Sequence, residues 1–413
     1  MSLPLTVRED FPLLCGAGAP VYLDNAATTQ KPRSVLDAEI GYYTTSNSNV
    51  GRGYHSLALA ATECYEHARS AVADMIGAGA GEIVFTMNTT DATNLVADTV
   101  GGRIVGPGDQ VVVSGMEHNS NLLPWRRLCE AKGAELVVVP VGPLGRVELA
   151  DFAAAMGPRV RIAAVAHVSN VLGTVNPVRE MAAVAHRHGV LVLVDGAQAV
   201  AHLPVDVRDL DADFYCFSGH KVYGPMGIGV LYSRSSLLED MPPFRVGGGT
   251  VKGVSTTEPV RYVGAPARFE AGTPNVAGAV GLAAGLDYLR GLGWEAVRAH
   301  DAELVEATLE AVADLGNVDV VGDPGDLPCG IVSLSVRGIH PYDVGAHLDA
   351  HGVAVRCGVH CASTFLDDLG LVGTVRLSFA VYNTVEEIEY VRSVLKTVQP
   401  GTWTTDHPTT RFL

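Results

Sequence analysis

The seven cysteines of this 413-residue sequence form no Cys-x-x-Cys pair. An odd number of scattered thiols does not suit a disulfide framework, so we expect a reducing compartment, by default the cytoplasm. The sequence also lacks the run of about 18 apolar residues that a membrane-spanning helix needs. Its first residues contain neither a basic segment nor an uninterrupted apolar segment. We therefore expect no transmembrane helix and no secretion signal.

Positive charge is scarce as well. The chain has 29 Lys and Arg against 45 Asp and Glu, a formal net charge of -16. Nucleic acids and anionic membrane surfaces bind clustered cations, so neither is expected as a partner. A small anionic ligand stays possible, because a few basic groups can be focused in a cleft. Apolar residues make up 47% and charged residues 18%, which is typical of a globular protein with a large core.

Apolar segments alternate with helical segments through the first two thirds of the chain, which predicts an α/β fold with a parallel or mixed sheet covered on both faces. The seven expected strands are 83–86, 110–113, 136–141, 160–166, 190–194, 214–217 and 228–232. The texture changes after a long helical stretch at 275–289. We expect a large domain over 21–280, and a smaller α+β domain made of 1–20 and 281–413.

Lys221 follows the expected strand 214–217 and a turn of Ser218, Gly219 and His220. Asp195 ends the expected strand 190–194 in the same way. An acid and a lysine at neighbouring strand ends suit a cofactor with a charged ring nitrogen and a Schiff base. The alternative is a surface lysine after an ordinary strand, and Lys221 taken alone favours that alternative.

Polar groups follow several other expected strands. These groups are Thr89-Thr90-Asp91, Glu117-His118-Asn119, His167 to Asn170, Asp195 to Gln198, and Ser218 to Lys221. Each group alone can be explained as a helix or turn cap. Ligands of such sheets bind outside the carboxyl ends of the strands, so five groups on one edge indicate a binding site. Threonine hydroxyls at the start of a helix near residue 90 also suit a phosphate group.

A second cluster lies in the expected small domain, in the run 355–362. Cys361 has His360 beside it and Arg356 five residues earlier, and cationic neighbours favour a reactive thiolate. The alternative is a buried cysteine that packs as a small hydrophobe, which suits Cys357 better. Metal binding by these cysteines and His360 is a third option, but no second ligand cluster is in view, so no metal is expected. Arg376, inside an apolar run, favours a carboxylate ligand.

Several motifs of the sequence occur together and in the order of a known family. They are Asp24 to Thr28, Glu117-His118, Ser169 to Thr174, Asp195 to Ala199, Ser218 to Lys221, Arg268 to Asn275, and Arg356-x-Gly-x-His360-Cys361-Ala362. With these motifs the chain resembles the class V aminotransferase family of pyridoxal 5'-phosphate (PLP) enzymes. It is most similar to group II cysteine desulfurases and selenocysteine lyases, from about residue 8 to 397.

The resemblance implies PLP fold type I, a homodimer, and removal of sulfur from L-cysteine to give alanine. Lys221 would bind PLP covalently and move the Cα proton, and Cys361 would accept the sulfur as a persulfide for transfer to an acceptor protein or small thiol. His118 would stack on the cofactor ring and move protons. The resemblance places the other cofactor contacts at Thr89, Thr90, Asn170, Asp195, Gln198, Ser218, His220 and, from the second subunit, Thr273.

For the substrate, the resemblance implies that Asn170 and Arg376 hold the carboxylate and that Arg356 orients the Cys361 loop. Gly51, Val359 and Tyr342 depart from common family patterns. They motivate an alternative, a carbon–sulfur or carbon–selenium lyase or an amino-acid epimerase on the same fold. A third reading is a cofactor-free scaffold that binds a sulfur carrier, which the intact lysine, aspartate and phosphate motifs disfavour.

Overall fold

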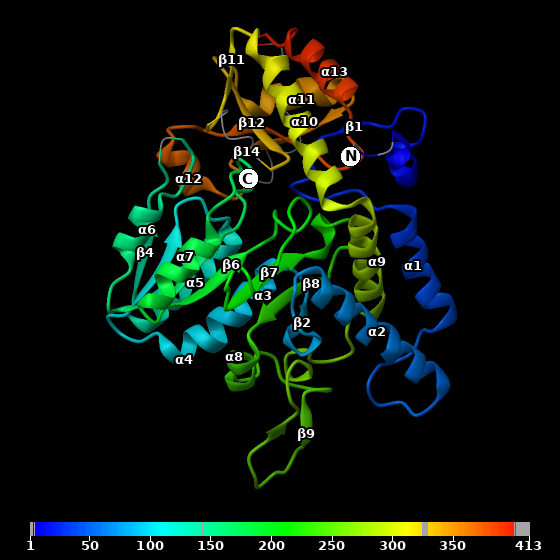
Figure 1. The fold of residues 1–413 in the computed structure, drawn as a ribbon, viewed down its shortest axis with the longest axis vertical. Coiled ribbons are helices and arrows are strands. Elements are labelled where there is room, and N and C mark those ends of the chain that lie inside the picture. The colour runs from blue at the N-terminus through cyan, green and yellow to red at the C-terminus, as the bar shows by residue number, and fades with distance from the viewer. Residues whose placement is uncertain (1–2, 4, 143, 324–328, 400, 402–413) are drawn as a thin grey trace.

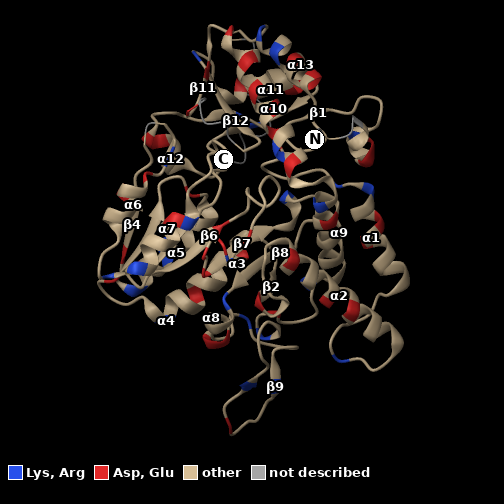
Figure 2. Cartoon of the chain, in the orientation of Figure 1, with Lys and Arg blue, Asp and Glu red and all other residues tan. Residues whose placement is uncertain are grey.

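A computed structural model of the chain describes residues 3, 5–142, 144–323, 329–399 and 401. A broad lower body carries a large sheet, and a smaller upper body carries the C-terminal helices (Figure 1). The sequence predicts loose order for the polar residues 399–413, of which 400 and 402–413 lie outside the described residues. Among the described helices, none is long and apolar enough to cross a membrane. Acidic side chains recur on the peripheral helices (Figure 2).

The large sheet has seven strands in the order β2-β8-β7-β6-β5-β3-β4. Its strands are β2 (Ile83–Thr86), β3 (Gln110–Ser114), β4 (Glu135–Val139), β5 (Val160–Ala166), β6 (Leu191–Asp195), β7 (Phe214–Ser218) and β8 (Gly229–Ser233). β8 runs antiparallel to both of its neighbours, and the other pairs are parallel. The predicted α/β fold with a mostly parallel seven-stranded sheet is confirmed.

Alternate residues of the central strands enter different hydrophobic clusters. Val111 and Val113 of β3 pack on one face of the sheet, whereas Val112 packs on the other. A sheet buried on both faces needs apolar residues at successive positions, which explains the continuous apolar runs. The helices of this body are α1 (Arg33–Thr45), α2 (Ser56–Met75), α3 (Thr89–Val96), α4 (Gly102–Ile104), α5 (Asn119–Lys132), α6 (Leu149–Ala155), α7 (Val178–Arg187) and α8 (Ser235–Asp240).

The smaller body has an antiparallel sheet in the order β11-β12-β15-β14. Its strands are β11 (Val318–Val320), β12 (Ile331–Val336), β14 (Arg356–Gly358) and β15 (Thr374–Ser378), and its helices are α10 (Trp294–Ala313), α11 (Pro341–Ala350), α12 (Ser363–Asp368) and α13 (Val385–Leu395). A separate strand pair joins β1 (Val21–Tyr22) to β13 (Val353–Ala354), so the N-terminal segment lies against the small domain.

Helix α9 (Val276–Leu292) leads from one body to the other and supports the turn after β7. A Cβ atom on Gly285 would lie 2.9 Å from the backbone nitrogen of Gly224 and 3.0 Å from the carbonyl oxygen of Val222. Glycine therefore permits the helix to touch the turn that carries Lys221. The domain division expected at residue 280 falls inside this helix and stays a prediction.

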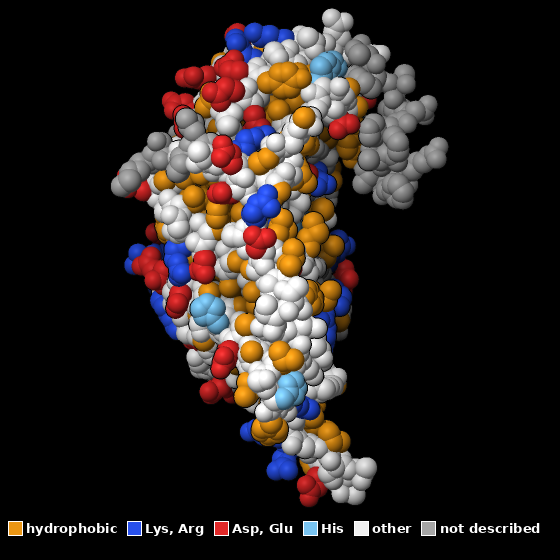
Figure 3. Space-filling model, turned by 90° about the vertical axis from the view of Figure 1, so that its right-hand side faces the viewer, with side chains coloured by type: hydrophobic (Ala, Val, Ile, Leu, Met, Phe, Trp, Pro, Cys, Tyr) orange, Lys and Arg blue, Asp and Glu red, His pale blue; other side chains and the backbone are white. Residues whose placement is uncertain are grey.

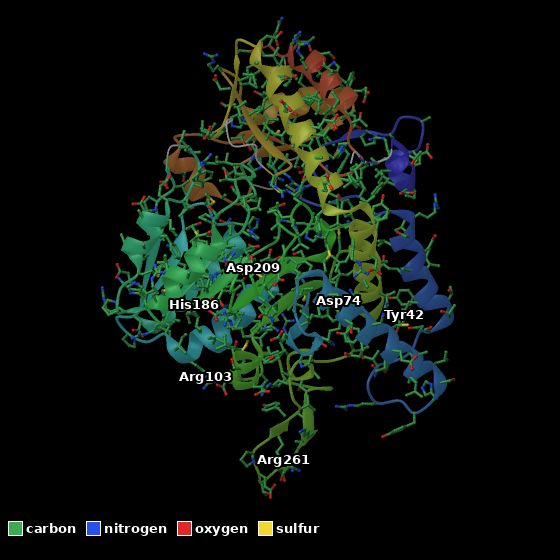
Figure 4. The ribbon with its side chains drawn as sticks, in the orientation of Figure 1. Tyr42, Asp74, Arg103, His186, Asp209 and Arg261 are labelled. Carbon is green, nitrogen blue, oxygen red and sulfur yellow. The ribbon has the colours of Figure 1, made fainter. Side chains whose placement is uncertain are left out.

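The Gly-rich run 246–250 follows α8 in the chain. It leads into a hairpin of β9 (Val251–Gly253) and β10 (Arg261–Tyr262), which projects from the lower body (Figure 1). Arg261 lies on this projection, away from the large sheet (Figure 4). Both strands are too short for their pattern to stand out in the sequence, as are helices α8 and α12.

Candidate active site

A cavity of about 310 Å³ lies where the parallel strands of the large sheet end and the small domain begins. The sequence-predicted residues that line it are Thr89, Thr90, His118, Asn170, Asp195, Gln198, Ser218, His220, Lys221, Arg356, Cys361 and Arg376. The expected gathering of strand-end groups is thus present, and the two domains supply opposite walls. Thr273 does not line this cavity within one chain but lies with Phe269 and Asn275 at a second hollow.

Lys221 ends a short 3-10 turn, Gly219–Lys221, directly after β7. The turn is tight, because a Cβ on Gly219 would lie 2.8 Å from Cγ2 of Ile228, the residue before β8. Burial lowers the pKa of the Lys221 amine to about 8, although the charge of Asp195 opposes that effect. A substantial neutral fraction at neutral pH makes this amine a usable nucleophile and base.

Asp195 is the last residue of β6 and is buried. Its Oδ1 accepts a hydrogen bond of 2.9 Å from the backbone N–H of Ala197. Burial raises the pKa of this carboxyl, and the Ala197 N–H and Lys221 reduce the rise without cancelling it. A buried carboxyl with so little compensation fits a cationic ring nitrogen, which would favour its ionised form.

His118 precedes α5 and caps it: its Nδ1 accepts a hydrogen bond of 3.1 Å from the backbone N–H of Ser120. Nδ1 therefore carries no proton, and the neutral ring carries its proton on Nε2. Burial, and then the charges of Lys221 and Arg376, lower the pKa of His118 to about 4. A neutral flat ring in the cavity wall suits stacking on an aromatic cofactor.

Hydroxyl groups gather at the start of α3. The Ser218 Oγ accepts from the backbone N–H of Thr89 at 2.9 Å and lies 2.8 Å from Thr89 Oγ1, and Thr90 Oγ1 lies 2.7 Å from Ser120 Oγ. Asn88 caps the helix. Hydroxyls beside a helix N-terminus favour an anion, so this wall fits a phosphate group.

The expected contact of Gln198 is already partly engaged: its Nε2 donates to the backbone carbonyl of Ala26 at 2.8 Å. His220 stays neutral near physiological pH, because burial, followed by the neighbouring Lys221 and Lys31, lowers its pKa to about 4. Both side chains line the cavity, and their contacts with the cofactor stay a prediction.

On the small-domain side of the cavity, the thiol of Cys361 is exposed. Cys361 and His360 form a tight turn, which we call the tip. His360 and Cys361 have φ values of 53° and 55°, in the left-handed region of backbone conformation that residues other than glycine rarely adopt. Two contacts from the large domain hold this tip. The carbonyl of His360 accepts from Nδ2 of Asn170, and the carbonyl of Cys361 accepts from the backbone N–H of Asn119, both at 2.8 Å.

Arg376 on β15 is buried at the bottom of the same wall. Its Nη1 donates to the carbonyl of Asn170 at 2.8 Å, Nη2 lies 3.4 Å from Asp24, and the buried Nε has no hydrogen-bond partner among the described residues. Burial lowers the pKa of this guanidinium to about 10. An underused buried cation fits an incoming carboxylate.

Arg356 lies opposite Arg376 on the neighbouring strand but is exposed and pairs with Asp24 at 2.9 Å. It links β14, which leads into the turn that carries Cys361, to the N-terminal segment. Sequence reasoning did not predict an ionic role for Asp24, because its partner arginines lie more than 300 positions away in the chain.

Two groups near the site, the buried Glu117 and the half-buried Lys31, had no assigned role. Glu117 accepts hydrogen bonds from Nδ2 of Asn121 at 2.6 Å and from the backbone N–H of Ala166 at 2.8 Å, yet burial raises its pKa to about 8. Lys31 donates to the carbonyl of His220, and burial lowers its pKa to about 8. Their surroundings, rather than any local pattern, create these properties.

One group of potential metal ligands is found among the described residues, outside the cavity: His202, Asp301 and Cys329, all buried. His202 Nδ1 and Asp301 Oδ2 lie 2.7 Å apart and already satisfy each other. Cys357 is half-buried on β14, and burial raises the pKa of its thiol to about 12, which agrees with a packing role.

A half-buried lysine beside a buried aspartate, hydroxyls at a helix start that fit a phosphate group, and this sheet define a PLP-binding α/β enzyme. The family model described as Aminotransferase class-V matches residues 21–391, and the chain belongs to that family. PLP is its cofactor, and the cavity residues fit that group.

Within the family the chain groups with the cysteine desulfurases. It is 45% identical over 394 residues to the cysteine desulfurase of Salmonella agona strain SL483, a match that covers 94% of this chain and 97% of the relative. The apo cysteine desulfurase structure from Thermococcus onnurineus NA1 superposes with a TM-score of 0.91 at 42% identity, over 96% of this chain and 98% of the other. CsdA from Escherichia coli gives 0.88 at 37% identity, with the same coverage.

Proposed function

We propose that the chain moves sulfur from L-cysteine onto Cys361 and releases alanine. The observation that carries this proposal is the meeting of a reactive lysine from one domain with an exposed thiol from the other in a single cavity. A β-eliminating lyase or an epimerase would keep Lys221 and depend less on Cys361. The thiol wall therefore favours desulfuration over the alternatives of the same fold.

The transfer balances without an external oxidant. The Cys361 thiolate attacks the substrate sulfur, an S–S bond forms, and the substrate C–S bond breaks. The electron pair of the C–S bond stays on the substrate carbon, which is protonated, so that Cys361-SH and L-cysteine become Cys361-S-SH and L-alanine. The persulfide then passes its outer sulfur to an acceptor thiol.

Bound PLP supplies an electron sink that stabilises negative charge at the substrate Cα. The chain's own residues do the rest. Lys221, with a pKa near 8, takes and returns the Cα proton. Asp195 would hold the ring nitrogen of the cofactor, and the Nε2–H of His118 is available as a proton donor. Arg376 and Asn170 orient the substrate carboxylate beside the Cys361 tip.

We also propose a homodimer. Helices α1 and α2 and the loop between them expose apolar side chains, among which Tyr54 is 98% and Ile40 and Tyr43 are each 61% exposed. Figure 3 looks onto this side and shows hydrophobic side chains along the middle of the face. Contiguous exposed apolar surface typically marks an interface. A second copy would supply Thr273 of the partner subunit to the phosphate end.

The compartment and the acceptor belong to this proposal too. All seven cysteines are free thiols, which suits the reducing cytoplasm. Cys361 is exposed, so either a sulfur-acceptor protein or a small thiol can reach the persulfide.

The test is product analysis with L-cysteine, PLP and a reductant. We expect alanine and sulfide in equal amounts, and a loss of at least about a hundredfold in Cys361→Ala. Cys357→Ala is the matched control, because this nearby thiol is half-buried, and it should keep the parent rate. Pyruvate in place of alanine, or a Cys361→Ala variant as fast as the parent, would reject the proposal.

A further inference from the structure

A chain of buried hydroxyl groups holds the side chain of His360, the residue before the nucleophile. Nε2 of His360 lies 2.7 Å from Oγ1 of Thr374 on β15. Thr374 Oγ1 lies 3.3 Å from Oγ of Ser333 on β12, and Ser333 Oγ donates to the carbonyl of Val171 at 2.6 Å. The chain runs from a loop of the large domain, through the small-domain sheet, to the tip that carries Cys361.

The direction of each hydrogen bond follows from counting hydrogens. A hydroxyl group has one hydrogen to donate. Ser333 uses its hydrogen on Val171, and Thr374 uses its own on Ser333. Thr374 Oγ1 must therefore accept from His360, so Nε2 of His360 carries the ring proton.

The other ring nitrogen of His360, Nδ1, is buried and has no hydrogen-bond partner among the described residues. Burial, and then Arg376 and Arg356, lower the pKa of His360 to about 3, so the ring is neutral in the working range. The bond to Thr374 thus fixes both the tautomer and the orientation of the ring.

The tip needs such an anchor because of its backbone. Both His360 and Cys361 have left-handed φ values, a conformation that persists only where the surroundings impose it. Asn170 and Asn119 hold the two tip carbonyls from the large domain. Thr374 adds the contact from the small domain, and it is the one that acts through a side chain of the tip itself.

We propose that Thr374 and Ser333 are positioning residues for Cys361. Their hydroxyls select the Nε2-protonated form of His360 and so hold the tip in the conformation that presents the thiol to the substrate sulfur. The effect on turnover rests on the proposed desulfuration, whereas the effect on the tautomer does not.

The kinetic test compares two substitutions at one position. Thr374→Val removes the hydroxyl at similar volume, and Thr374→Ser keeps it. We expect Thr374→Val to lower kcat about tenfold, which corresponds to about 1.4 kcal/mol, with KM for L-cysteine within about twofold, because the carboxylate site is unchanged. Thr374→Ser should return kcat to within about twofold of the parent.

Thr308→Val is the matched control. Thr308 is also a buried small-domain threonine, but its hydroxyl donates to the carbonyl of Leu304 in its own helix. This variant should keep the parent kcat. Equal losses in Thr308→Val and Thr374→Val, or a Thr374→Ser variant no better than Thr374→Val, would overturn the positioning role.

A spectroscopic test is independent of activity. In holoenzyme with ¹⁵N-labelled histidine, the His360 signals are those lost in His360→Gln. We expect protonated Nε2 and unprotonated Nδ1 in the parent, and mixed tautomers in Thr374→Val. A parent His360 protonated on Nδ1 would reject the inference. If the parent releases no alanine, the proposed function fails, and the tautomer measurement still decides this inference.

Discussion

The two walls of the cavity are built in different ways. In the large domain, the buried Asp195 ends β6 and the half-buried Lys221 follows the adjacent parallel strand β7, and burial shifts the pKa of both groups. In the small domain, Cys361 is exposed on a left-handed tip held by contacts from distant residues. The cofactor wall, which carries Lys221 and Asp195, is therefore positioned by the large sheet. The thiol wall, which carries Cys361, depends on contacts between the two domains.

The largest expected effect is the loss of activity in Lys221→Ala, and it distinguishes the role of the cofactor wall from that of the thiol wall. Lys221→Ala should lower alanine formation at least about thousandfold and also remove the visible absorbance of bound PLP, because one amine both holds the cofactor and moves the proton. Cys361→Ala should retain that absorbance. Spectra and product assays on the same samples provide the measurement.

Lys252→Ala, which removes an exposed lysine of the projecting hairpin, is the control for Lys221→Ala. If Lys221→Ala kept the PLP absorbance and Cys361→Ala lost it, the division of labour between the walls would be reversed.

A smaller effect is expected for substitutions of the arginine proposed to bind the substrate carboxylate. Arg376→Lys keeps the charge but loses the planar fork that can bind a carboxylate through two hydrogen bonds, so KM for L-cysteine should rise about 10- to 100-fold. Arg356→Lys, its exposed neighbour across the strand pair, should change KM less than about threefold. Steady-state kinetics check both, and equal effects would contradict the assignment of the carboxylate site to Arg376.

The pH dependence of cofactor uptake tests the burial of the lysine. Because the pKa of Lys221 is lowered to about 8, the reactive neutral amine grows about tenfold per pH unit below that value and levels off above it. The rate at which apoprotein binds PLP should follow this curve in stopped-flow absorbance. A rate that keeps rising to about pH 10 would indicate an unperturbed lysine and an open cofactor wall.

Local patterns predicted which large-domain residues gather at one edge of the sheet. Apolar runs that end in Asp195 and Ser218 indicate where two strands end. The carboxyl ends of parallel strands lie at the same edge of a sheet, independently of the loops that follow them. The strand β8, which runs antiparallel, changes nothing at that edge because its neighbours β2 and β7 remain parallel to each other.

The thiol wall was predicted in composition but not in construction. The sequence indicated Cys361, Arg356 and Arg376, yet the ion pairs of both arginines with Asp24 join segments far apart in the chain. The left-handed backbone of His360 and Cys361 is imposed by tertiary contacts, and neither residue type signals it. Thr273 shows the same limit, because its expected place requires a second chain.

The smallest expected effect concerns the stability of the contact between the two domains. His202, from the large domain, and Asp301, on α10, form a buried pair. Burial alone would lower the pKa of His202, but the charge and hydrogen bond of Asp301 outweigh it and raise that pKa. The pair therefore contributes its full stability below the unfolded pKa of about 6.5 and loses it as pH rises through the folded pKa.

His202→Gln should lower the free energy of unfolding, measured in urea, by about 2 kcal/mol at pH 6 and by less at pH 9. The exposed His188→Gln should cost nothing at either pH. A cost for His202→Gln that grows toward pH 9 would mean that the pair holds the domains together without charge.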